Sequence, residues 1–225
     1  MLHSAGCDLG DSGPLKLHRS MYIPRQPELA ELVIADPPDA WRELGFDVDL
    51  KGHLDIGGVR LRLGSEGEGI SAWSLMRVNA MGSIDGLPSP VPRVLYPPPF
   101  KTHPNGATGI DHVVILSSSL DRTAAALARA GIELKRTQES GRGRMGFRRL
   151  GPAILEVVQR DDLEGDEATF WGLAVVVISI ESLAERLGDR LGPIKQATQP
   201  GRRIATLRPE AGISTALAFM SPEPP

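Results

Sequence analysis

The sequence predicts an α+β fold built from repeated units with the element order β-α-β-β-β. Three observations support this prediction. Apolar strand-like segments are followed by a helix start at Ser or Asp, the helix ends at a glycine, and further strand candidates come next. The same order occurs three times along the chain. A unit of about 50–60 residues is too small to bury both faces of its sheet, so the units are expected to pair.

The composition excludes several classes of protein. The chain has 225 residues, of which 41% are hydrophobic and 24% charged, as in an ordinary globular protein. The net charge of −3 argues against nucleic-acid binding, which usually needs a basic surface. The single cysteine, Cys7, excludes an internal disulfide and fits a cytoplasmic location. No apolar run reaches the length of a membrane span, so no membrane partner is expected.

The first unit is expected in residues 21–80, after a Gly/Ser/Asp-rich tail over residues 1–20 that we expect to be disordered. It should hold a strand, a short helix that ends at Gly45, and further strands, at residues 29–35, 40–44, 46–49, 54–63 and 70–78. Gly57 and Gly58 predict a hairpin turn. A proline-rich segment over residues 81–108 is expected to be an extended connector, and it marks the best boundary in the chain.

The second and third units are expected in residues 109–160 and 168–221, which together form the principal domain, 109–221. Ser117, Ser118 or Ser119 caps a predicted helix over 120–130, and Ser179 caps another over 180–191. The strands of these units are predicted at residues 110–116, 132–137, 145–150, 153–159, 171–178, 194–198, 202–207 and 213–220.

Two ionisable residues interrupt the apolar strands of the second unit. His112 lies in the strand Asp111-His112-Val113-Val114, and Glu156 lies in the strand Ile154-Leu155-Glu156-Val157-Val158. Burying either side chain without a partner is costly, so the two should pair with each other or bind one metal ion.

These two strands, with Leu120-Asp121 opening the helix between them, resemble the vicinal oxygen chelate superfamily, which includes glyoxalase I, extradiol dioxygenases and bleomycin-binding proteins. The resemblance covers residues 109–221, and residues 21–80 look like a degenerate extra copy. It implies that two βαβββ units pair and that their mixed sheet curls into a cup. It also implies that His112 and Glu156 are metal ligands, for Zn, Mn, Fe or Ni, with Glu156 as the catalytic proton carrier.

The third unit departs from the superfamily pattern. Leu173 stands where a second histidine is expected, and the last strand, Thr215-Ala216-Leu217-Ala218-Phe219, has no carboxylate or histidine. Half of the expected ligand set is therefore missing. Two hypotheses could supply further ligands. Glu31 of the first unit could be a third ligand, or a symmetric dimer could bring ligands from two subunits together. A hydrogen-bonded His112–Glu156 pair without metal is the simpler interpretation.

Two function hypotheses follow from the resemblance. One is a metal-dependent lyase or dioxygenase that uses His112 and Glu156. The alternative is a metal-free protein of the bleomycin-resistance type, which binds or sequesters a small molecule in the cup. Arg203 and Trp171 are candidate substrate-binding residues, although charged strand edges and core or rim aromatics are the commoner roles. The odd first unit should pack on the outside of the pair or on its copy in a homodimer.

Overall fold

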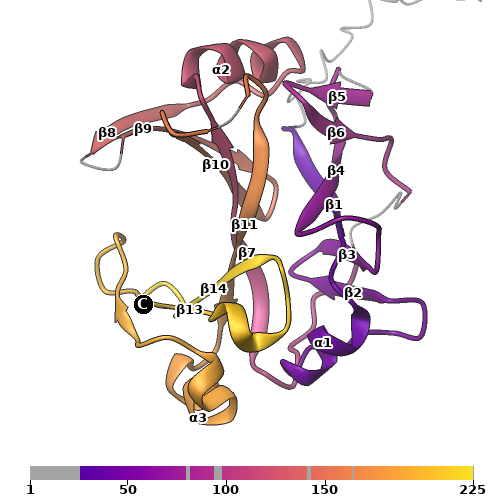
Figure 1. The fold of residues 1–225 in the computed structure, drawn as a ribbon, viewed down its shortest axis with the longest axis vertical. Coiled ribbons are helices and arrows are strands. Elements are labelled where there is room, and N and C mark those ends of the chain that lie inside the picture. The colour runs from indigo at the N-terminus through magenta and orange to yellow at the C-terminus, as the bar shows by residue number, and fades with distance from the viewer. Residues whose placement is uncertain (1–25, 80–81, 94–97, 141–142, 164, 225) are drawn as a thin grey trace, which may run out of the picture.

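A computed structural model describes residues 26–79, 82–93, 98–140, 143–163 and 165–224 of the chain. The predicted tail over residues 1–20 lies outside this range. Two β-sheets face each other, one with four strands and one with eight (Figure 1). In the part of the chain that the structure describes, no helix is both long and apolar enough to cross a membrane.

The eight-stranded sheet consists of two paired βαβββ units, which confirms the predicted α+β fold. Its strand order is β12-β13-β14-β11-β7-β10-β9-β8, with β7 and β11 antiparallel at the centre. The first unit contains β7 (Ala107–Ser117), α2 (Leu120–Arg129), β8 (Arg136–Ser140), β9 (Gly143–Leu150) and β10 (Ala153–Gln159). The second contains β11 (Thr169–Val177), α3 (Ile180–Leu187), β12 (Lys195–Gln196), β13 (Arg203–Thr206) and β14 (Ala216–Met220).

Serine caps fix the start of both helices in this sheet. The hydroxyl of Ser119 accepts a hydrogen bond from the backbone N–H of Arg122, and that of Ser179 accepts one from Ser182. Each bond satisfies an amide that has no partner within the first helical turn. The buried side chains of both helices then pack on one face of the sheet, at Leu120, Ala126, Leu127, Ile180, Leu183 and Leu187.

The N-terminal unit follows the predicted order of elements but has a different strand arrangement. It contains β1 (Glu28–Ile34), α1 (Pro38–Glu43), β2 (His53–Ile56), β3 (Val59–Leu63) and β4 (Ile70–Met76). Its strand order is β2-β3-β1-β4, so β4 does not close the unit but lies antiparallel to β1 on the other side. Residues 46–49, predicted as a strand, form none. The predicted connector contains the hairpin β5 (Gly82–Ile84) and β6 (Leu87–Ser89).

The four-stranded sheet reproduces half of the larger sheet residue for residue. The β1–β4 ladder has two irregularities, and both recur in the β7–β11 ladder, which has a third between Val176 and Val177. In this register Glu31 opposite Ser74 corresponds to His112 opposite Ala174. The hairpin of β2 and β3 likewise matches that of β9 and β10. Strand β4 is therefore the counterpart of β11, and residues 46–49 take the place of β8. The N-terminal unit is a truncated copy of the same module.

The two sheets pack back to back. Trp73 on β4 contacts Phe170 on β11 edge to face, with their ring centres 5.5 Å apart. Phe46 stacks on Phe219 of β14, with their ring centres 6.3 Å apart. Buried Asp36 adds a polar contact, because its carboxylate accepts hydrogen bonds from the backbone and hydroxyl groups of Ser214. The N-terminal unit therefore packs on the outside of the pair, which was one of the two predicted alternatives.

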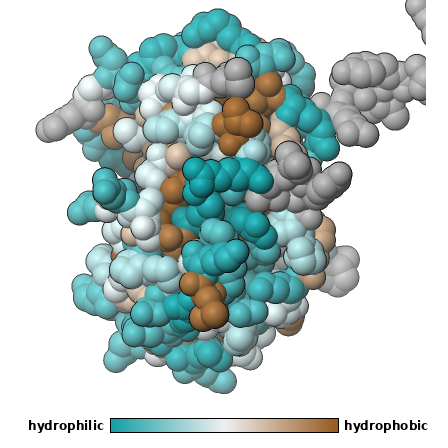
Figure 2. All heavy atoms as spheres, turned by 90° about the vertical axis from the view of Figure 1, so that its right-hand side faces the viewer, coloured by the Kyte–Doolittle hydropathy of each residue, from teal (hydrophilic) through white to brown (hydrophobic). Residues whose placement is uncertain are grey.

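The other face of the eight-stranded sheet, which we call the concave face, is not covered by a layer of helices or strands from the described residues. Both ends of the sheet curve toward this side, away from the N-terminal sheet (Figure 1). The corresponding face of the N-terminal sheet is turned outward, and that side of the molecule is largely hydrophilic (Figure 2).

Candidate functional site

The register of the central strands places His112 and Glu156 on the concave face. Residues that are paired across a sheet lie on the same face, so Ile154 on β10, His112 on β7 and Ala174 on β11 form one row. The next row contains Glu156, Val114 and Gly172. His112 and Glu156 are thus diagonal neighbours on adjacent strands.

Apolar side chains on the concave face are partly open to solvent. Their sequence neighbours at alternate positions, such as Leu155, Val157 and Leu173, are buried in the core between the two sheets. Partial exposure is found on this face at Leu116, Ile154, Val158, Val176, Ala216 and Ala218, whereas Val114 and Ala174 at its middle are buried. Apolar side chains that stay partly open to solvent on a curved sheet are typical of a ligand-binding surface.

A β-bulge brings Asp111 beside His112. Ala174 pairs with His112 and Val175 pairs with Ile110, so Asp111 is an extra residue that breaks the alternation of side chains. Its carboxylate contacts Nδ1 of His112, and both side chains are about nine-tenths buried. This contact leaves Nε2 as the ring nitrogen that Asp111 does not use.

A buried arginine completes this cluster. Arg202, which precedes β13 and is 4% exposed, donates from Nη1 to Oδ1 of Asp111 at 2.6 Å and from Nε to the carbonyl of Ser221 at 3.0 Å. Burial acts to raise the pKa of Asp111, but its interactions with His112 and Arg202 outweigh burial and hold the pKa below its ordinary value. Asp111 therefore stays ionised at neutral pH and orients the His112 ring.

The pseudo-symmetry of the sheet identifies the positions in the second unit that correspond to His112 and Glu156. His112 lies seven residues before the capping Ser119, and Gly172 lies seven before Ser179. Ile154 pairs with His112 as Ala216 pairs with Gly172, so Glu156 corresponds to Ala218. The prediction that placed Leu173 at the histidine position was wrong by one residue, because Leu173 faces the core.

Gly172 has no room for a side chain. A Cβ atom at this position would lie 2.1 Å from the backbone oxygen of Ala216 on β14. A histidine there would require the two strands to move apart. The second unit therefore supplies no metal donor at Gly172 or Ala218, whereas the first unit has His112 and Glu156 at the corresponding positions.

This donor set does not fit a metal centre of the kind that the resemblance implies. Among the described residues, no group of three or more His, Cys, Asp or Glu side chains is placed to hold a metal ion. Glu31 is not a third ligand, because it lies in the other sheet, where Arg62 and the backbone N–H of Arg93 contact its carboxylate. Asp111 is already engaged by Arg202 and His112.

Two further predicted site residues lie apart from His112. Arg203 faces the helix side of the sheet, where it forms an ion pair with Glu181 of α3. Trp171 is the extra residue of a second bulge, between Phe170 and Gly172, and is 54% exposed. It is adjacent in sequence to Gly172 on the concave face. Their roles in substrate binding stay predictions.

The contacts of Asp111 with His112 and Arg202 were not predicted from the sequence. A bulge has no reliable sequence signal, and without one Asp111 would point away from His112. Arg202 lies 91 residues from its partner in sequence, so their contact depends on the fold.

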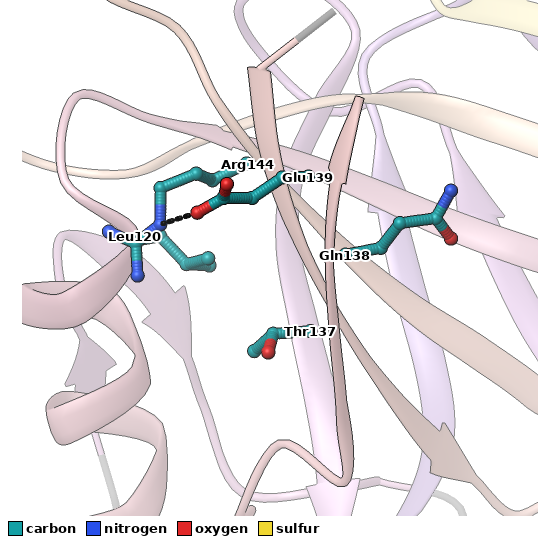
Figure 3. A pocket seen from close by; sticks show the side chains of 5 residues that line it. All are labelled: Leu120, Thr137, Gln138, Glu139 and Arg144. Carbon is teal, nitrogen blue, oxygen red and sulfur yellow. Dashed lines mark ion pairs between the residues drawn. The ribbon is translucent and has the colours of Figure 1, made fainter. Parts of the chain in front are cut away.

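A separate small cavity lies on the helix side of the sheet. It has a volume of about 220 Å³ and is lined by Leu120, Thr137, Gln138, Glu139 and Arg144 (Figure 3). Arg144 is fully engaged there by Asp121 and Glu139. The cavity is thus separate from the concave face.

Comparison with known proteins identifies the fold. A triple mutant of 4-hydroxymandelate synthase from Streptomyces coelicolor superimposes with a TM-score of 0.56 over 88% of this chain and 92% of that chain, at 18% sequence identity. This chain has the vicinal oxygen chelate fold. The methylmalonyl-CoA epimerase of Mycobacterium tuberculosis covers 53% of this chain and 91% of its own length, with 21% identity and a TM-score of 0.45. No protein-family model matches the sequence, and no curated protein matches it.

The match to the synthase covers more of the chain than the eight-stranded sheet alone, in agreement with a second, truncated vicinal oxygen chelate module at the N-terminus. At this level of identity the comparison establishes the fold, and the activity must be argued from the site itself.

Replacing Gly172 tests whether this position has no room for a side chain. Gly172→Ala should lower the free energy of unfolding by about 1–3 kcal/mol or more, because the added methyl group meets the β14 backbone. Gly109→Ala is the matched control on the neighbouring strand, where an added Cβ contacts nothing within 4 Å. Urea unfolding measures both, and equal stability of the two variants would contradict the account of Gly172.

Replacing Asp111 tests the buried ion pair. Asp111→Asn should destabilise the protein by about 3 kcal/mol at pH 7, because it leaves the Arg202 charge buried without its partner. The folded-state pKa of Asp111 lies below the unfolded value, so this stabilisation is present above about pH 4 and declines as the pH falls further.

The measurement is urea unfolding of both proteins between pH 3 and pH 7. Asp121→Asn, which removes the exposed partner of Arg144, is the control and should leave stability unchanged. A wild-type advantage that persists undiminished at pH 3 would contradict this role of Asp111.

Proposed function

We propose that the protein binds a small molecule on the concave face without the help of a metal ion. The observation that carries this proposal is that Gly172, which has no room for a donor side chain, lies within a partly exposed apolar surface. The fold supplies the curved sheet, and the second unit has lost both of its donor positions. What remains is a surface suited to apolar contact, with a few polar groups to orient a ligand.

The two halves of the concave face suit different parts of a ligand. The half formed by β11 and β14 has small side chains at Gly172, Ala174, Ala216 and Ala218, so an apolar group can approach the backbone closely. The half formed by β7 and β10 carries His112 and Glu156 among larger side chains. A ligand that places an apolar body on the first half and a polar group beside Nε2 of His112 would fit both halves.

The competing hypothesis is a metal-dependent lyase or dioxygenase with His112 and Glu156 as ligands and Glu156 as proton carrier. It requires at least one more donor, since catalytic sites normally have three protein ligands. We expect the purified, untagged protein to contain less than stoichiometric Zn, Mn, Fe or Ni by mass spectrometry. Ala218→His should raise zinc affinity, because it restores one donor at an open position.

Stoichiometric metal in the wild-type protein that disappears in His112→Ala would contradict the metal-free proposal. The variant Ala218→His also serves as its positive control, because a gain of zinc binding shows that the two natural donors are accessible.

Ligand binding has an internal reporter. Trp41 and Trp73 are fully buried, whereas Trp171 is exposed beside Gly172, so a ligand on the concave face should change the fluorescence of Trp171. We expect octanamide, a neutral probe with an apolar chain, to alter the emission of the wild-type protein. Ala218→Phe should abolish this response, because the new ring fills the space above β14.

Ala72→Phe is the matched control, since Ala72 is the register counterpart of Gly172 on the outward face of the N-terminal sheet. Loss of the response in Ala72→Phe and not in Ala218→Phe would place the ligand on the wrong sheet and contradict the proposal.

A homodimer stays a prediction. It was expected because the N-terminal unit has no partner unit of its own. In the structure that unit packs against the larger sheet of the same chain, so this reason for a dimer no longer applies. Light scattering at micromolar concentration measures the oligomeric state directly.

A further inference from the structure

We propose that the ligand of the concave face carries an anionic group, a carboxylate or a phosphate, which binds to Arg136 and Arg149. This inference rests on the proposed function and specifies the class of ligand. Three observations support it. Both arginines lie on the concave face, neither has a carboxylate partner among the described residues, and the N-terminal sheet has ion pairs at equivalent positions.

Both arginines belong to the concave face. Arg149 on β9 pairs with Ile154, which pairs with His112, so the three residues share one row. Arg136 on β8 pairs with Phe147, which pairs with Glu156 in the next row. Gly146 on β9 faces Leu134 and Leu120 on the helix side. Because side chains alternate along a strand, Phe147 and Arg149 face the concave side, and so does Arg136, which pairs with Phe147.

The distance between the arginines and the histidine suits one small ligand. Strands lie about 4.8 Å apart, so Arg149, two strands from His112, has its Cα atom about 10 Å away across the sheet. A ligand of that length can bind the arginines with one end and reach His112 with the other, whereas β11 and β14 lie about 14 and 19 Å from Arg149 by the same spacing.

Neither arginine has a carboxylate partner among the residues that the structure describes. By contrast, Arg144 on the helix side of the same strand is bound by Asp121 and Glu139. Arginine offers a planar fork of donors that matches carboxylate and phosphate groups, so an arginine without an acidic partner at the edge of an apolar surface is suited to an anionic ligand.

The truncated copy shows the paired alternative at equivalent positions. There, the residue that corresponds to Arg149 is Asp55, and it binds Arg60 through two hydrogen bonds of 2.8 and 3.1 Å. The residues that correspond to His112 and Glu156 are Glu31 and Arg62, which form an ion pair with each other. On that sheet the charges neutralise one another within the protein, whereas β8 and β9 present positive charge that is not neutralised in this way.

Arg136 is also held in position. Its guanidinium lies over the ring of Phe147, 5.5 Å from the ring centre, and Nη2 donates to Oε1 of Gln138 at 2.7 Å. These contacts reduce the conformational freedom that Arg136 loses when an anion binds, which favours affinity.

The test compares three probes that each have eight carbon atoms, by isothermal titration calorimetry on the full-length protein: octanamide, octanoate and octyl phosphate. Octanoate or octyl phosphate should bind about tenfold more tightly than octanamide, because a charge-assisted hydrogen bond adds to the same apolar contact. The better of the two anions distinguishes a carboxylate from a phosphate ligand.

Two variants and one control locate the anion. Arg149→Gln and Arg136→Gln should each remove most of the preference for the anion while leaving octanamide binding unchanged. Arg144→Gln, on the other face of β9, should leave the preference intact. All three positions are on the surface, so the variants should fold, and far-ultraviolet circular dichroism verifies this.

The outcomes separate the two proposals. Equal binding of octanamide and both anions, or a preference that survives in Arg149→Gln and Arg136→Gln, would overturn the anion site and leave the proposed function standing. Absence of binding by all three probes would overturn the proposed function and the anion site with it. An equal loss in Arg144→Gln would show a nonspecific charge effect and also overturn the anion site.

Discussion

The antiparallel ladder between β7 and β11 is the constraint on which the rest of the structure depends. It joins the two βαβββ units into one sheet, and its bulges decide which side chains reach the concave face. One bulge turns Asp111 toward His112, and a second sets exposed Trp171 beside Gly172. The β1–β4 ladder repeats the same pairings with Ala30 and Ser71 as the extra residues. The bulges therefore belong to the architecture, and the side chains placed in them are free to differ.

The two copies have used the same architecture differently. At the position of Asp111 the N-terminal copy has an alanine, so the fold does not require a carboxylate in the bulge. A buried ion pair such as Asp111–Arg202 adds little stability compared with apolar packing, and its clearest effect here is to fix the orientation of His112. The N-terminal copy has turned its polar positions into internal ion pairs on a hydrophilic outer surface (Figure 2). The larger sheet keeps an apolar concave face with His112 at its centre.

Much of this fold could be predicted from the sequence, because serine caps, apolar strands and the glycine turn at residues 57–58 are local signals. The strand arrangement of the N-terminal unit could not. The order β-α-β-β-β looks the same whether β4 closes one unit or opens the next, and only the pairing with β1 distinguishes the two. The register of their strands puts His112 and Glu156 on one face, but the partner that the structure shows for His112 is Asp111. Asp111, Arg202 and the closed position at Gly172 depend on a bulge, on a contact 91 residues apart in sequence and on the approach of a neighbouring strand.

If the proposed function is right, ligands bind to the concave face of the larger sheet. Methyl-resolved NMR of alanine-labelled protein during titration with octanoate tests it most directly, because alanines mark both faces. The account predicts shifts of the Ala174, Ala216 and Ala218 methyl signals, with little change at Ala205, which is buried on the helix side, or at Ala72 on the outer sheet. Shifts confined to Ala72 or Ala205, with those three signals unchanged, would contradict it.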